Sequence, residues 1–430
     1  MSKQKISPAK TISGAVEVPG DKSISHRYAI LAALASGPSE IAHFSAADDC
    51  HRTLECFRRM GIEVDQRGDS VRVSGAPKDG LRAPRRTLDA GNSGTTMRLL
   101  AGVLAGQKFR CKLDGDGSLR RRPMRRVIDP LTRMGAKIAS RNGGTAPLEI
   151  EGTPLHAIEY KLPVASAQVK SAILLAGLFA AGETSVIEEI PTRDHTELAL
   201  EEFGAEVIRE GRAIRISGGA HLEGRKLTVP GDLSSAAFFL AAALILPGSN
   251  LLVHEVGLNP TRTAVLDAFA RMGGAVKPVS IRVAGGELIG DLSVSYAPLT
   301  GGVIEGAEIA NLIDELPVLA ALGPYTEQGI EIRNAEELRV KESDRIAAIV
   351  ENLRRMGATV DERPDGLRVE GRRAGRLRGA KIETRGDHRM AMAFAVAALG
   401  AVGTSVIDDA QCAAVSYPDF FATLERLVER

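Results

Sequence analysis

Two kinds of helical segment alternate along the chain, and their hydrophobic spacing distinguishes them. The first kind is amphipathic, with apolar residues at helical spacing, and it ends in Met-Gly or Phe-Gly before an apolar strand. Its five copies are 54–64, 128–138, 198–207, 266–276 and 350–360, and 418–430 resembles a sixth that stops before its glycine. Glycine is favoured where a helix ends in the left-handed conformation. The pattern predicts such caps at Gly61, Gly135, Gly204, Gly273 and Gly357.

The second kind of segment is apolar on nearly all faces, so we expect these helices to be buried. Each copy begins with a polar, mostly glycine-containing start, and the six copies begin near 20, 91, 165, 231, 314 and 386. Short strands such as 71–75, 183–189 and 367–371 separate the helices. The alternation predicts an α/β fold of βαβ-type units, and the chain length favours two domains of three units each.

The domain boundary is expected where the chain crosses twice between domains. Segments 14–23 and 226–235 match each other, each with a strand followed by Val-Pro-Gly-Asp and a helix start. Crossings there would give one domain of residues 20–230 and a second of residues 1–19 with 231–430. Both segments are also compatible with ordinary strand–turn–helix junctions.

Composition narrows the class of function. The 430 residues include 55 Lys+Arg and 54 Asp+Glu, a formal net charge of +1, which argues against a general polyanion binder. Aromatic residues make up 4% and Trp is absent, which disfavours base-stacking surfaces. The four Cys form no CxxC pattern, and neither a signal-peptide core nor a membrane-length apolar run is present. We expect a soluble cytoplasmic protein with reduced thiols, and no partnership with nucleic acid or membrane.

The starts of the buried helices carry the candidate chemistry. A helix N-terminus offers free N–H groups and the positive end of the dipole, so it attracts anions. Ser, Thr and Asn at these starts could be simple caps. Caps do not require the cations that accompany them, which are Lys22, Arg27, Arg98 and Arg389. Repetition of this arrangement favours a site for an anionic small molecule.

Other charged residues extend this prediction. Arg122 directly precedes Pro123, which stiffens the following helix start, and an Arg can bind carboxylate or phosphate with two hydrogen bonds. Asp314 is a candidate base, although an acid at a helix start also complements the dipole. Glu342 could equally form an ion pair across one helix turn. GxSxG, GxxxxGK[ST] and HExxH motifs are absent, so we expect Lys, Arg and helix dipoles to neutralise the ligand without metal or cofactor.

At these motifs the chain closely resembles the 5-enolpyruvylshikimate-3-phosphate (EPSP) synthase family. The matching segments occur in family order along essentially the whole chain: 19-PGDKSISHR-27, 91-GNSGTTMR-98, 122-RPM-124, 166-SAQVKSA-172, 314-DELP-317, 339-RVKESDR-345, 387-DHRMAM-392 and 417-YPDFF-421. The resemblance implies two domains of three βαβαββ units with buried helices, an inside-out α/β barrel of the enolpyruvyl transferase type.

The resemblance also implies a reaction. The enolpyruvyl group of phosphoenolpyruvate would move to the 5-hydroxyl of shikimate 3-phosphate by addition and elimination through a tetrahedral intermediate, releasing phosphate. This step belongs to the shikimate pathway, which leads to chorismate and the aromatic amino acids. Closure of the two domains would exclude water from the intermediate. We expect a monomer.

The site residues follow from the same resemblance, position by position. Shikimate 3-phosphate would be held by Lys22, Ser23, Arg27, Ser166, Gln168, Arg193, Asp314 and Lys341. Phosphoenolpyruvate would be held by Lys22, Gly94, Arg122, Gln168, Arg345 and Arg389. The catalytic residues would be Asp314 and Glu342, as the acid/base pair, with Lys22.

Some positions depart from part of the family. Ala167, Glu337 and Val415 replace the Ser, Asn and Lys that many members carry, and 192-TRDHTE-197 replaces a Ser/Tyr pattern. These changes resemble a second branch of the family, in which an Arg at the place of Arg193 helps to bind shikimate 3-phosphate. Gly94, where some herbicide-tolerant members carry Ala, would leave room for glyphosate.

Two other readings compete with this one. The first is the sister transfer to UDP-N-acetylglucosamine, whose usual acid is a Cys in a mobile loop. The corresponding segment 115–124 contains no Cys, and Cys111 lies in an apolar strand pattern. The second is a non-catalytic anion- or RNA-binding protein, or an RNA-end-processing enzyme built from similar repeats, and the scarce aromatics and balanced charge disfavour both.

Overall fold

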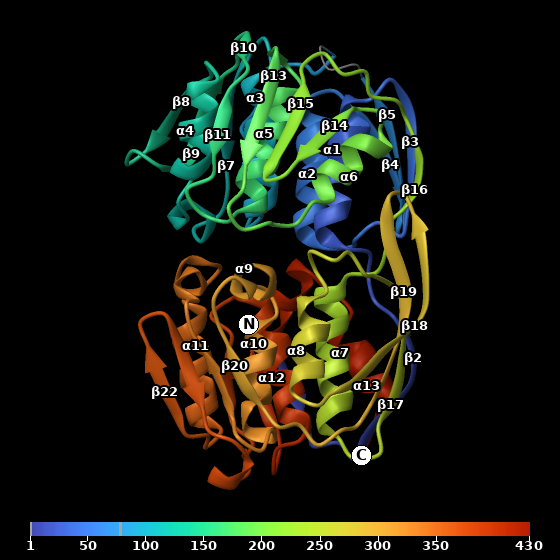
Figure 1. The fold of residues 1–430 in the computed structure, drawn as a ribbon, viewed down its shortest axis with the longest axis vertical. Helices are drawn as coiled ribbons and strands as arrows, with labels where there is room; N and C mark the ends of the chain where they lie inside the picture. Colours follow the sequence, from blue (N-terminus) through green and yellow to red (C-terminus); the bar gives the residue numbers. More distant parts are fainter. Residues whose placement is uncertain (1, 77–79) are drawn as a thin grey trace. The chain divides into compact units, whose positions relative to one another are not determined.

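Helices and strands alternate along the chain and belong to two units (Figure 1). The computed structural model describes residues 2–76 and 80–430. The 20–229 unit comprises Gly20–Val229 with Val283–Glu287, and the 230–430 unit comprises Met1–Pro19, Pro230–Arg282 and Leu288–Arg430. Val283–Glu287 is the turn region of the hairpin between residues 275–284 and 287–295, and no sequence pattern predicted that it groups with residues 20–229.

The 20–229 unit contains three four-stranded sheets with the same strand order. In each sheet the first two strands are parallel and the remaining pairs are antiparallel. The sheets are, in spatial order, β16 (Lys226–Thr228), β3 (Gly37–Ala42), β5 (Ser70–Gly75) and β4 (Glu63–Arg67); β6 (Leu88–Asp89), β7 (Arg110–Asp114), β9 (Thr145–Glu151) and β8 (Lys137–Arg141); and β11 (Glu159–Lys161), β13 (Glu183–Ile187), β15 (Ala213–Ser217) and β14 (Val207–Glu210). A short parallel pair joins β10 (Leu155–His156) and β12 (Ala180–Ala181).

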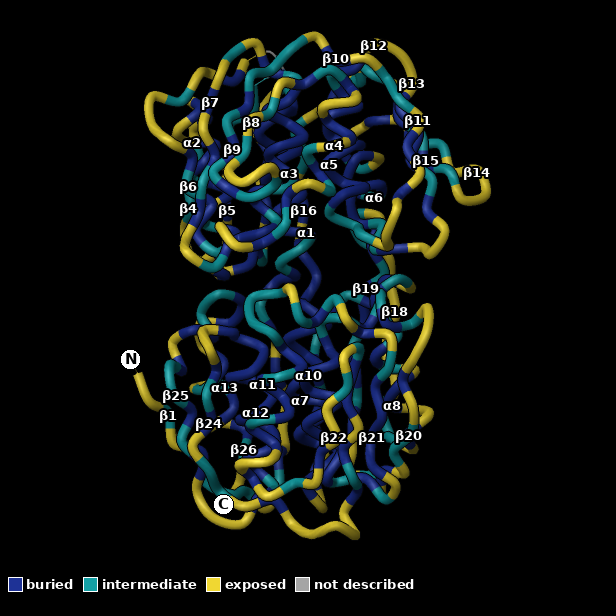
Figure 2. The backbone as a smooth tube through the Cα atoms, turned by 90° about the vertical axis from the view of Figure 1, so that its left-hand side faces the viewer, coloured by how far each residue is buried: buried dark blue, intermediate teal, exposed yellow. Residues whose placement is uncertain are grey.

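The core of this unit is made by helices of the all-apolar kind. These are α1 (Lys22–Leu34), α3 (Gly94–Ala105) and α5 (Ala167–Gly177). Nearly all of their residues are buried, and α3 packs along α5 (Figures 1 and 2). The amphipathic helices are α2 (Asp48–Arg59), α4 (Arg125–Arg133) and α6 (His195–Glu202).

The 230–430 unit repeats this sheet order with strands taken from the N-terminus. One sheet is β20 (Gly302–Ile304), β21 (Ile330–Ile332), β23 (Gly366–Val369) and β22 (Val360–Arg363); the second is β18 (Ala275–Ala284), β19 (Glu287–Ser295), β17 (Asn250–Gly257), β2 (Thr11–Glu17) and β26 (Val428–Glu429); the third is β1 (Lys3–Ile6), β25 (Ser405–Asp408) and β24 (Lys381–Glu383). Near the N-terminus, β2 is parallel to its neighbour β17. It therefore fills the position that β6, β11 and β20 fill beside β7, β13 and β21 in their sheets.

The helices of the 230–430 unit divide in the same way. They are α7 (Leu233–Ile245), α8 (Ala264–Arg271), α9 (Glu308–Leu312), α10 (Leu316–Leu322), α11 (Arg345–Arg355), α12 (His388–Leu399) and α13 (Phe420–Leu427). Every residue of α7, α10 and α12 is buried. The predicted α/β fold with buried apolar helices is therefore confirmed.

The predicted helix ends are also confirmed. Gly61, Gly135, Gly204, Gly273 and Gly357 have φ values of 89°, 107°, 97°, 86° and 88°, all left-handed. The four cysteines are unpaired and buried. Among the described residues, no helix combines the length and apolar character that crossing a membrane requires.

Candidate active site

The start of α1 presents the first candidate ligands in the 20–229 unit. Asp21 caps the helix, because its Oδ1 accepts a hydrogen bond from Ile24 N at 2.9 Å. Lys22 and Ser23 are the first helical residues, where free N–H groups and the dipole favour an anion. The Lys22 Nζ lies 3.0 Å from Asp49 Oδ2, so the ammonium is oriented by a carboxylate from α2.

Arg27 lies one turn further along α1 and is almost fully buried. Its guanidinium donates to Thr196 Oγ1 at 2.6 Å, to Ser171 Oγ at 2.9 Å and to Ser23 O at 2.8 Å. The pKa of Arg27 is lowered to about 10, mainly by burial and to a smaller extent by the charge of Arg193, while Glu197 opposes both effects. Arg193 is half-buried, and its charge acts on the Arg27 guanidinium.

The starts of α3 and α5 are joined by side-chain hydrogen bonds. Arg98 donates to Gln168 Oε1 at 2.5 Å, and Gln168 Nε2 donates to Thr95 Oγ1 at 2.9 Å. Ser166 is the N-cap of α5, since its Oγ accepts from Val169 N at 3.4 Å. The capping interpretation of Ser166 is thus correct, whatever else its hydroxyl binds.

Arg122 lies in the segment between β7 and α4, and its side chain extends to the start of α3. It follows the 3₁₀ helix η1 (Leu119–Arg121), and its guanidinium donates to Asn92 Oδ1 at 2.6 Å. A methyl group added at Gly94 would lie 3.2 Å from Arg122 Nη1 and 3.0 Å from Arg98 Nη1. Two guanidinium groups therefore converge on the backbone of Gly94 at the first turn of α3.

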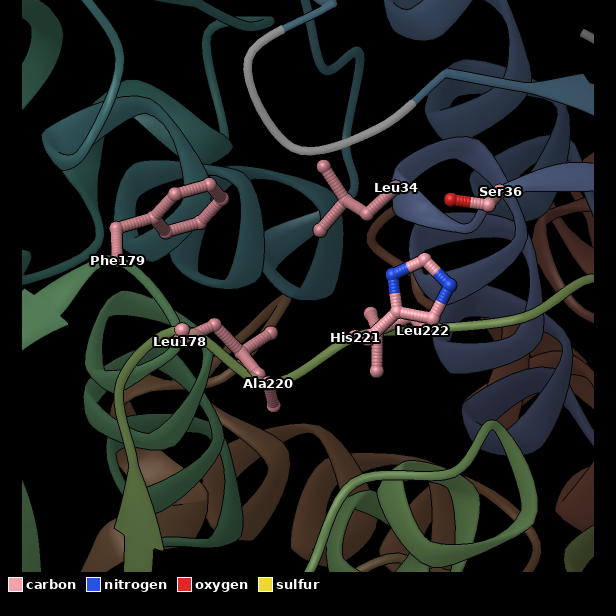
Figure 3. A pocket seen from close by; sticks show the side chains of 8 residues that line it. Leu34, Ser36, Leu178, Phe179, Ala220, His221 and Leu222 are labelled. Carbon is pink, nitrogen blue, oxygen red and sulfur yellow. The ribbon is translucent and has the colours of Figure 1, made fainter.

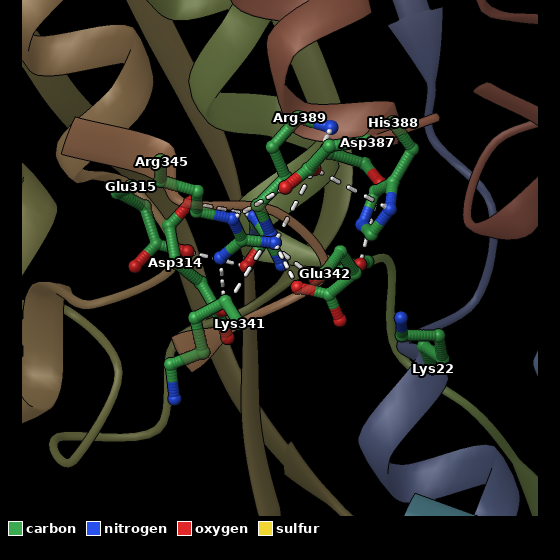
Figure 4. Close-up of polar contacts among 12 residues, drawn as sticks. Lys22, Asp314, Glu315, Lys341, Glu342, Arg345, Asp387, His388 and Arg389 are labelled. Atoms are coloured by element: carbon green, nitrogen blue, oxygen red, sulfur yellow. Dashed lines mark hydrogen bonds and ion pairs between the residues drawn. The ribbon is translucent and has the colours of Figure 1, made fainter. Parts of the chain in front are cut away.

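Arg345 organises the candidate residues of the 230–430 unit (Figure 4). It is fully buried at the start of α11, and its guanidinium donates to Asp387 Oδ2 at 2.8 Å and to Glu342. Its Nη1 lies 3.6 Å from Asp314 Oδ1. Burial alone would lower the pKa of Arg345, but the three carboxylates outweigh burial and raise it above the ordinary arginine value. The two candidate acid/base residues thus contact one permanent cation.

Asp314 is held from a second direction by α12. Arg389 Nη1 donates to the Asp314 carbonyl oxygen at 2.7 Å, and Arg389 Nε lies 3.4 Å from Asp314 Oδ1. Asp387 caps α12 by accepting from Arg389 N at 3.0 Å. Asp314 lies before α10 and keeps about a fifth of its side-chain surface exposed, so its carboxylate is fixed but accessible.

Lys341 follows the 3₁₀ helix η3 (Glu336–Val340) and lies 3.6 Å from Glu337 Oε1. Burial lowers the pKa of Lys341, and the carboxylates of Glu337 and Asp314 partly offset this effect. Glu337 therefore supplies the lysine with a carboxylate at a position where many relatives were expected to carry Asn.

Each unit thus gathers its own part of the predicted site. Lys22, Ser23 and Arg27 share α1. In the other unit, Asp314 and Glu342 contact the buried guanidinium of Arg345, Arg389 contacts Asp314, and the charge of Asp314 acts on Lys341. Sequence reasoning missed the partners Asp49, Thr196 and Asp387. Asp387 stood in the quoted 387-DHRMAM-392 segment, but no spacing signal singled out Asp49 or Thr196.

A small cavity of about 100 Å³ lies elsewhere in the 20–229 unit (Figure 3). Its lining is Leu34, Ser36, Leu178, Phe179, Gly219, Ala220, His221 and Leu222. Leu34 ends α1 and Leu178 follows α5, so this cavity lies at the opposite ends of the helices from Lys22 and Ser166. Among residues 2–76 and 80–430, no group of three or more His, Cys, Asp or Glu side chains is placed to hold a metal ion.

Comparison with solved structures first identifies the class of fold. The enolpyruvyl transferase NikO from Streptomyces tendae has the same fold, with a TM-score of 0.78 and 20% identity over 98% of this chain and 96% of that one. The EPSP synthase structure from Acinetobacter baumannii is closer, with a TM-score of 0.88 and 41% identity over 99% and 98% of the two chains.

The family is then defined by sequence. The family model for EPSP synthase (3-phosphoshikimate 1-carboxyvinyltransferase) matches residues 6–424. A 3-phosphoshikimate 1-carboxyvinyltransferase from Solibacter usitatus is 54% identical over 99% of this chain and 100% of its own length. The chain belongs to the EPSP synthase family.

Proposed function

We propose that the protein transfers the enolpyruvyl group of phosphoenolpyruvate to the 5-hydroxyl of shikimate 3-phosphate and releases phosphate. The observation that carries this proposal is the family match over residues 6–424, which spans both units. The reaction places the enzyme in the shikimate pathway to chorismate and aromatic amino acids. Its substrates are small anionic molecules that together carry two phosphates and two carboxylates.

The chemistry sets what the side chains must do. The substrate hydroxyl loses a proton and its oxygen bonds to C2 of phosphoenolpyruvate, while C3 gains a proton and becomes a methyl group. The resulting tetrahedral intermediate then loses a proton from that methyl group and expels phosphate, which restores the double bond. Fixed cations stabilise the negative charge on both phosphates without moving during the reaction.

We assign shikimate 3-phosphate to eight residues, and the placement of Lys22, Ser23, Ser166 and Gln168 at helix starts supports the assignment. The set is Lys22, Ser23, Arg27, Ser166, Gln168, Arg193, Asp314 and Lys341. Arg27 supports this role because its guanidinium is already oriented by Thr196 and Ser171. Guanidinium groups suit carboxylate and phosphate because they donate in parallel pairs.

Phosphoenolpyruvate is assigned to Lys22, Gly94, Arg122, Gln168, Arg345 and Arg389. The convergence of Arg122 on the first turn of α3 supports this role, since helix dipole and guanidinium both favour an anion there. Arg345 is oriented by Asp387, and Arg389 by the carbonyl oxygen and the carboxylate of Asp314.

Asp314 and Glu342 are assigned as the acid/base pair, with Lys22 as the third catalytic group. Both carboxylates contact Arg345 and both stay partly exposed, so each can exchange protons with a bound substrate. The contacts do not assign the two proton transfers to one residue or the other.

The rival transfer to UDP-N-acetylglucosamine is not favoured. That reaction was expected to use a Cys as acid, and segment 115–124 has none. Cys111 lies in β7, and burial raises its pKa to about 12, so it holds its proton near neutral pH. The other alternative, a non-catalytic anion- or RNA-binding protein, does not require the paired carboxylates around Arg345.

We also propose that the enzyme is a monomer located in the cytoplasm, with no nucleic-acid or membrane partner. Four unpaired cysteines support a reducing compartment. Light scattering coupled to gel filtration would test the monomer, and a mass near twice 45.6 kDa would overturn it.

Phosphate release from the purified protein tests the reaction. The assay contains shikimate 3-phosphate and phosphoenolpyruvate, omits each in turn, and is repeated with a chelator and with UDP-N-acetylglucosamine as acceptor. We expect release only when both proposed substrates are present, at a rate that the chelator does not change. Release with the sugar nucleotide alone as acceptor would favour the rival reaction.

A further inference from the structure

A buried lysine lies behind the proposed shikimate 3-phosphate ligands in the 20–229 unit. Lys170, on α5, is 1% exposed, and its Nζ lies 2.8 Å from Glu188 Oε2 and 2.6 Å from Glu197 Oε1. The same ammonium lies 3.4 Å from the Thr192 carbonyl oxygen. Three separate segments of chain therefore meet at one cation. Removing a buried charge from such a group leaves the partner charges uncompensated, which is strongly unfavourable.

Lys170, Glu188 and Glu197 form an ion triad, and the residues next to it in sequence orient Arg27. Ser171 follows Lys170 in α5 and accepts a hydrogen bond from Arg27, and Thr196 precedes Glu197 in α6 and accepts another. Ser171 and Thr196 also contact each other at 2.6 Å. A shift of α6 relative to α5 would therefore move both acceptors of the Arg27 guanidinium.

The ion triad of Lys170, Glu188 and Glu197 also holds together the two ends of the segment that carries Arg193. Glu188 and Glu197 lie on either side of this segment, and Lys170 contacts both ends. Thr192 Oγ1 donates to Glu188 as well, which ties the residue next to Arg193 back to the start of the loop. The backbone position of Arg193 thus depends on Lys170.

The charge of Lys170 is as important as its contacts. Glu197 is 1% exposed, and burial raises its pKa, although Lys170 opposes this effect. Glu197 also raises the pKa of Arg27, so its carboxylate acts on the arginine that faces the proposed substrate. Without the ammonium, the buried carboxylate of Glu197 would compete with an anionic substrate for Arg27.

We propose that Lys170 is a positioning residue for shikimate 3-phosphate, acting through its ion pairs with Glu188 and Glu197 on Arg27 and Arg193. This inference rests on the proposed function and deepens it. Lys170 does not contact the substrate. It holds two cationic ligands in place and neutralises the Glu197 carboxylate that would otherwise draw Arg27 away.

Steady-state kinetics of Lys170→Met tests the inference. We expect the KM for shikimate 3-phosphate to rise by about 10- to 100-fold, as removal of a supporting partner behind a ligand commonly causes. The KM for phosphoenolpyruvate and the kcat at saturating shikimate 3-phosphate stay within about 2-fold, because Asn92 orients Arg122, Asp387 orients Arg345 and Asp314 orients Arg389. Lys137→Met is the matched control, since it removes an exposed lysine paired with Glu151 at 2.6 Å, and it leaves both KM values unchanged.

Charge compensation gives a second readout that a purely structural role would not produce. In Lys170→Met/Glu197→Gln one uncompensated carboxylate is removed, so the KM for shikimate 3-phosphate recovers toward the wild-type value. Glu188→Gln keeps the lysine and loosens only the Arg193 segment, so it raises this KM selectively and by less. That variant also serves if Lys170→Met does not fold.

The outcomes separate this inference from the reaction itself. Wild-type turnover combined with equal changes in both KM values, or with only a lower melting temperature, would overturn the role of Lys170 alone. An unchanged KM for shikimate 3-phosphate in Glu188→Gln would do the same. No phosphate release by the wild-type protein would overturn the proposed function and, with it, this inference.

Discussion

At the scale of single residues, the site is organised by guanidinium groups whose own positions are fixed by carboxylates. Arg345 shows this most clearly, because Asp387 orients it while Glu342 and Asp314 share its remaining edge. Such an arrangement holds both acids close to a cation that cannot lose its proton near neutral pH. A group that exchanges protons in the transition state must also stay accessible, as these two do.

Replacing either acid tests this role. In Asp314→Asn and in Glu342→Gln we expect kcat to fall by roughly 10²–10⁴-fold, the usual contribution of a positioned general acid or base. Asp361→Asn is the matched control, because that carboxylate is 68% exposed on β22 and pairs with the surface residue Arg363. Wild-type turnover in Asp314→Asn would remove Asp314 from the mechanism.

Gly94 tests the proposed phosphoenolpyruvate site. We expect glyphosate to inhibit the enzyme in competition with phosphoenolpyruvate, and Gly94→Ala to raise the inhibition constant. The added methyl group would approach the ends of Arg98 and Arg122 at 3.0 and 3.2 Å, so these flexible groups must shift by a few tenths of an ångström. An unchanged inhibition constant, measured alongside the phosphoenolpyruvate KM, would contradict this placement.

At the scale of elements, hydrogen bonds between buried side chains hold the helices together. His26 Nδ1 contacts Thr53 Oγ1 at 2.7 Å, and Thr53 contacts Thr96 Oγ1 at 2.8 Å, which links α1, α2 and α3. Burial lowers the pKa of His26 well below its ordinary value, and Lys22 and Arg27 lower it further while Asp21 opposes them. The imidazole is therefore neutral in the folded protein.

A neutral buried histidine makes stability depend on pH. The unfolded chain takes up the His26 proton below a pH of about 6.5, so the free energy of unfolding falls as pH drops from there toward the lower folded pKa. The slope from this residue is at most about 1.4 kcal/mol per pH unit. We expect His26→Gln to lose this contribution in urea unfolding between pH 5 and 8. Parallel curves for the two proteins would contradict the assignment.

The glycine caps give a second prediction for the elements. Gly357 has φ 88°, and an added Cβ would meet nothing within 4 Å, so Gly357→Ala introduces backbone strain without a clash. We expect it to lower the free energy of unfolding by about 1–2 kcal/mol, and Gly357→Asn to lower it by less because Asn tolerates this conformation. Equal stability of the alanine variant and wild type in urea would show that the cap is not strained.

The elements also show what the sequence could and could not predict. The buried helices and the glycine caps were predictable because both depend on local spacing and backbone conformation. The pairing of β16 with β3 was not, because residues 226–228 and 40–42 are far apart in sequence. Lys170 was visible only as one more cation at a helix start, since its partners Glu188 and Glu197 are brought to it by tertiary packing.

At the scale of the whole molecule, the six repeated segments divide the chemistry between two units. The 20–229 unit supplies cations at the starts of three buried helices, and the 230–430 unit supplies the two acids around Arg345. The family match over residues 6–424 includes both sets of residues, and the proposed reaction assigns a role to each. The central claim is that C3 of phosphoenolpyruvate gains a proton in the addition step. A proton is then lost from the same carbon when phosphate is eliminated.

Turnover in deuterated water tests this claim most directly. If C3 of phosphoenolpyruvate becomes a methyl group in the intermediate, part of the product must carry deuterium in its vinyl methylene group, which NMR and mass spectrometry both detect. We expect incorporation to require both substrates and to become undetectable over the same assay time in Asp314→Asn and Glu342→Gln. Product formed at the wild-type rate with no deuterium at that carbon would contradict the account.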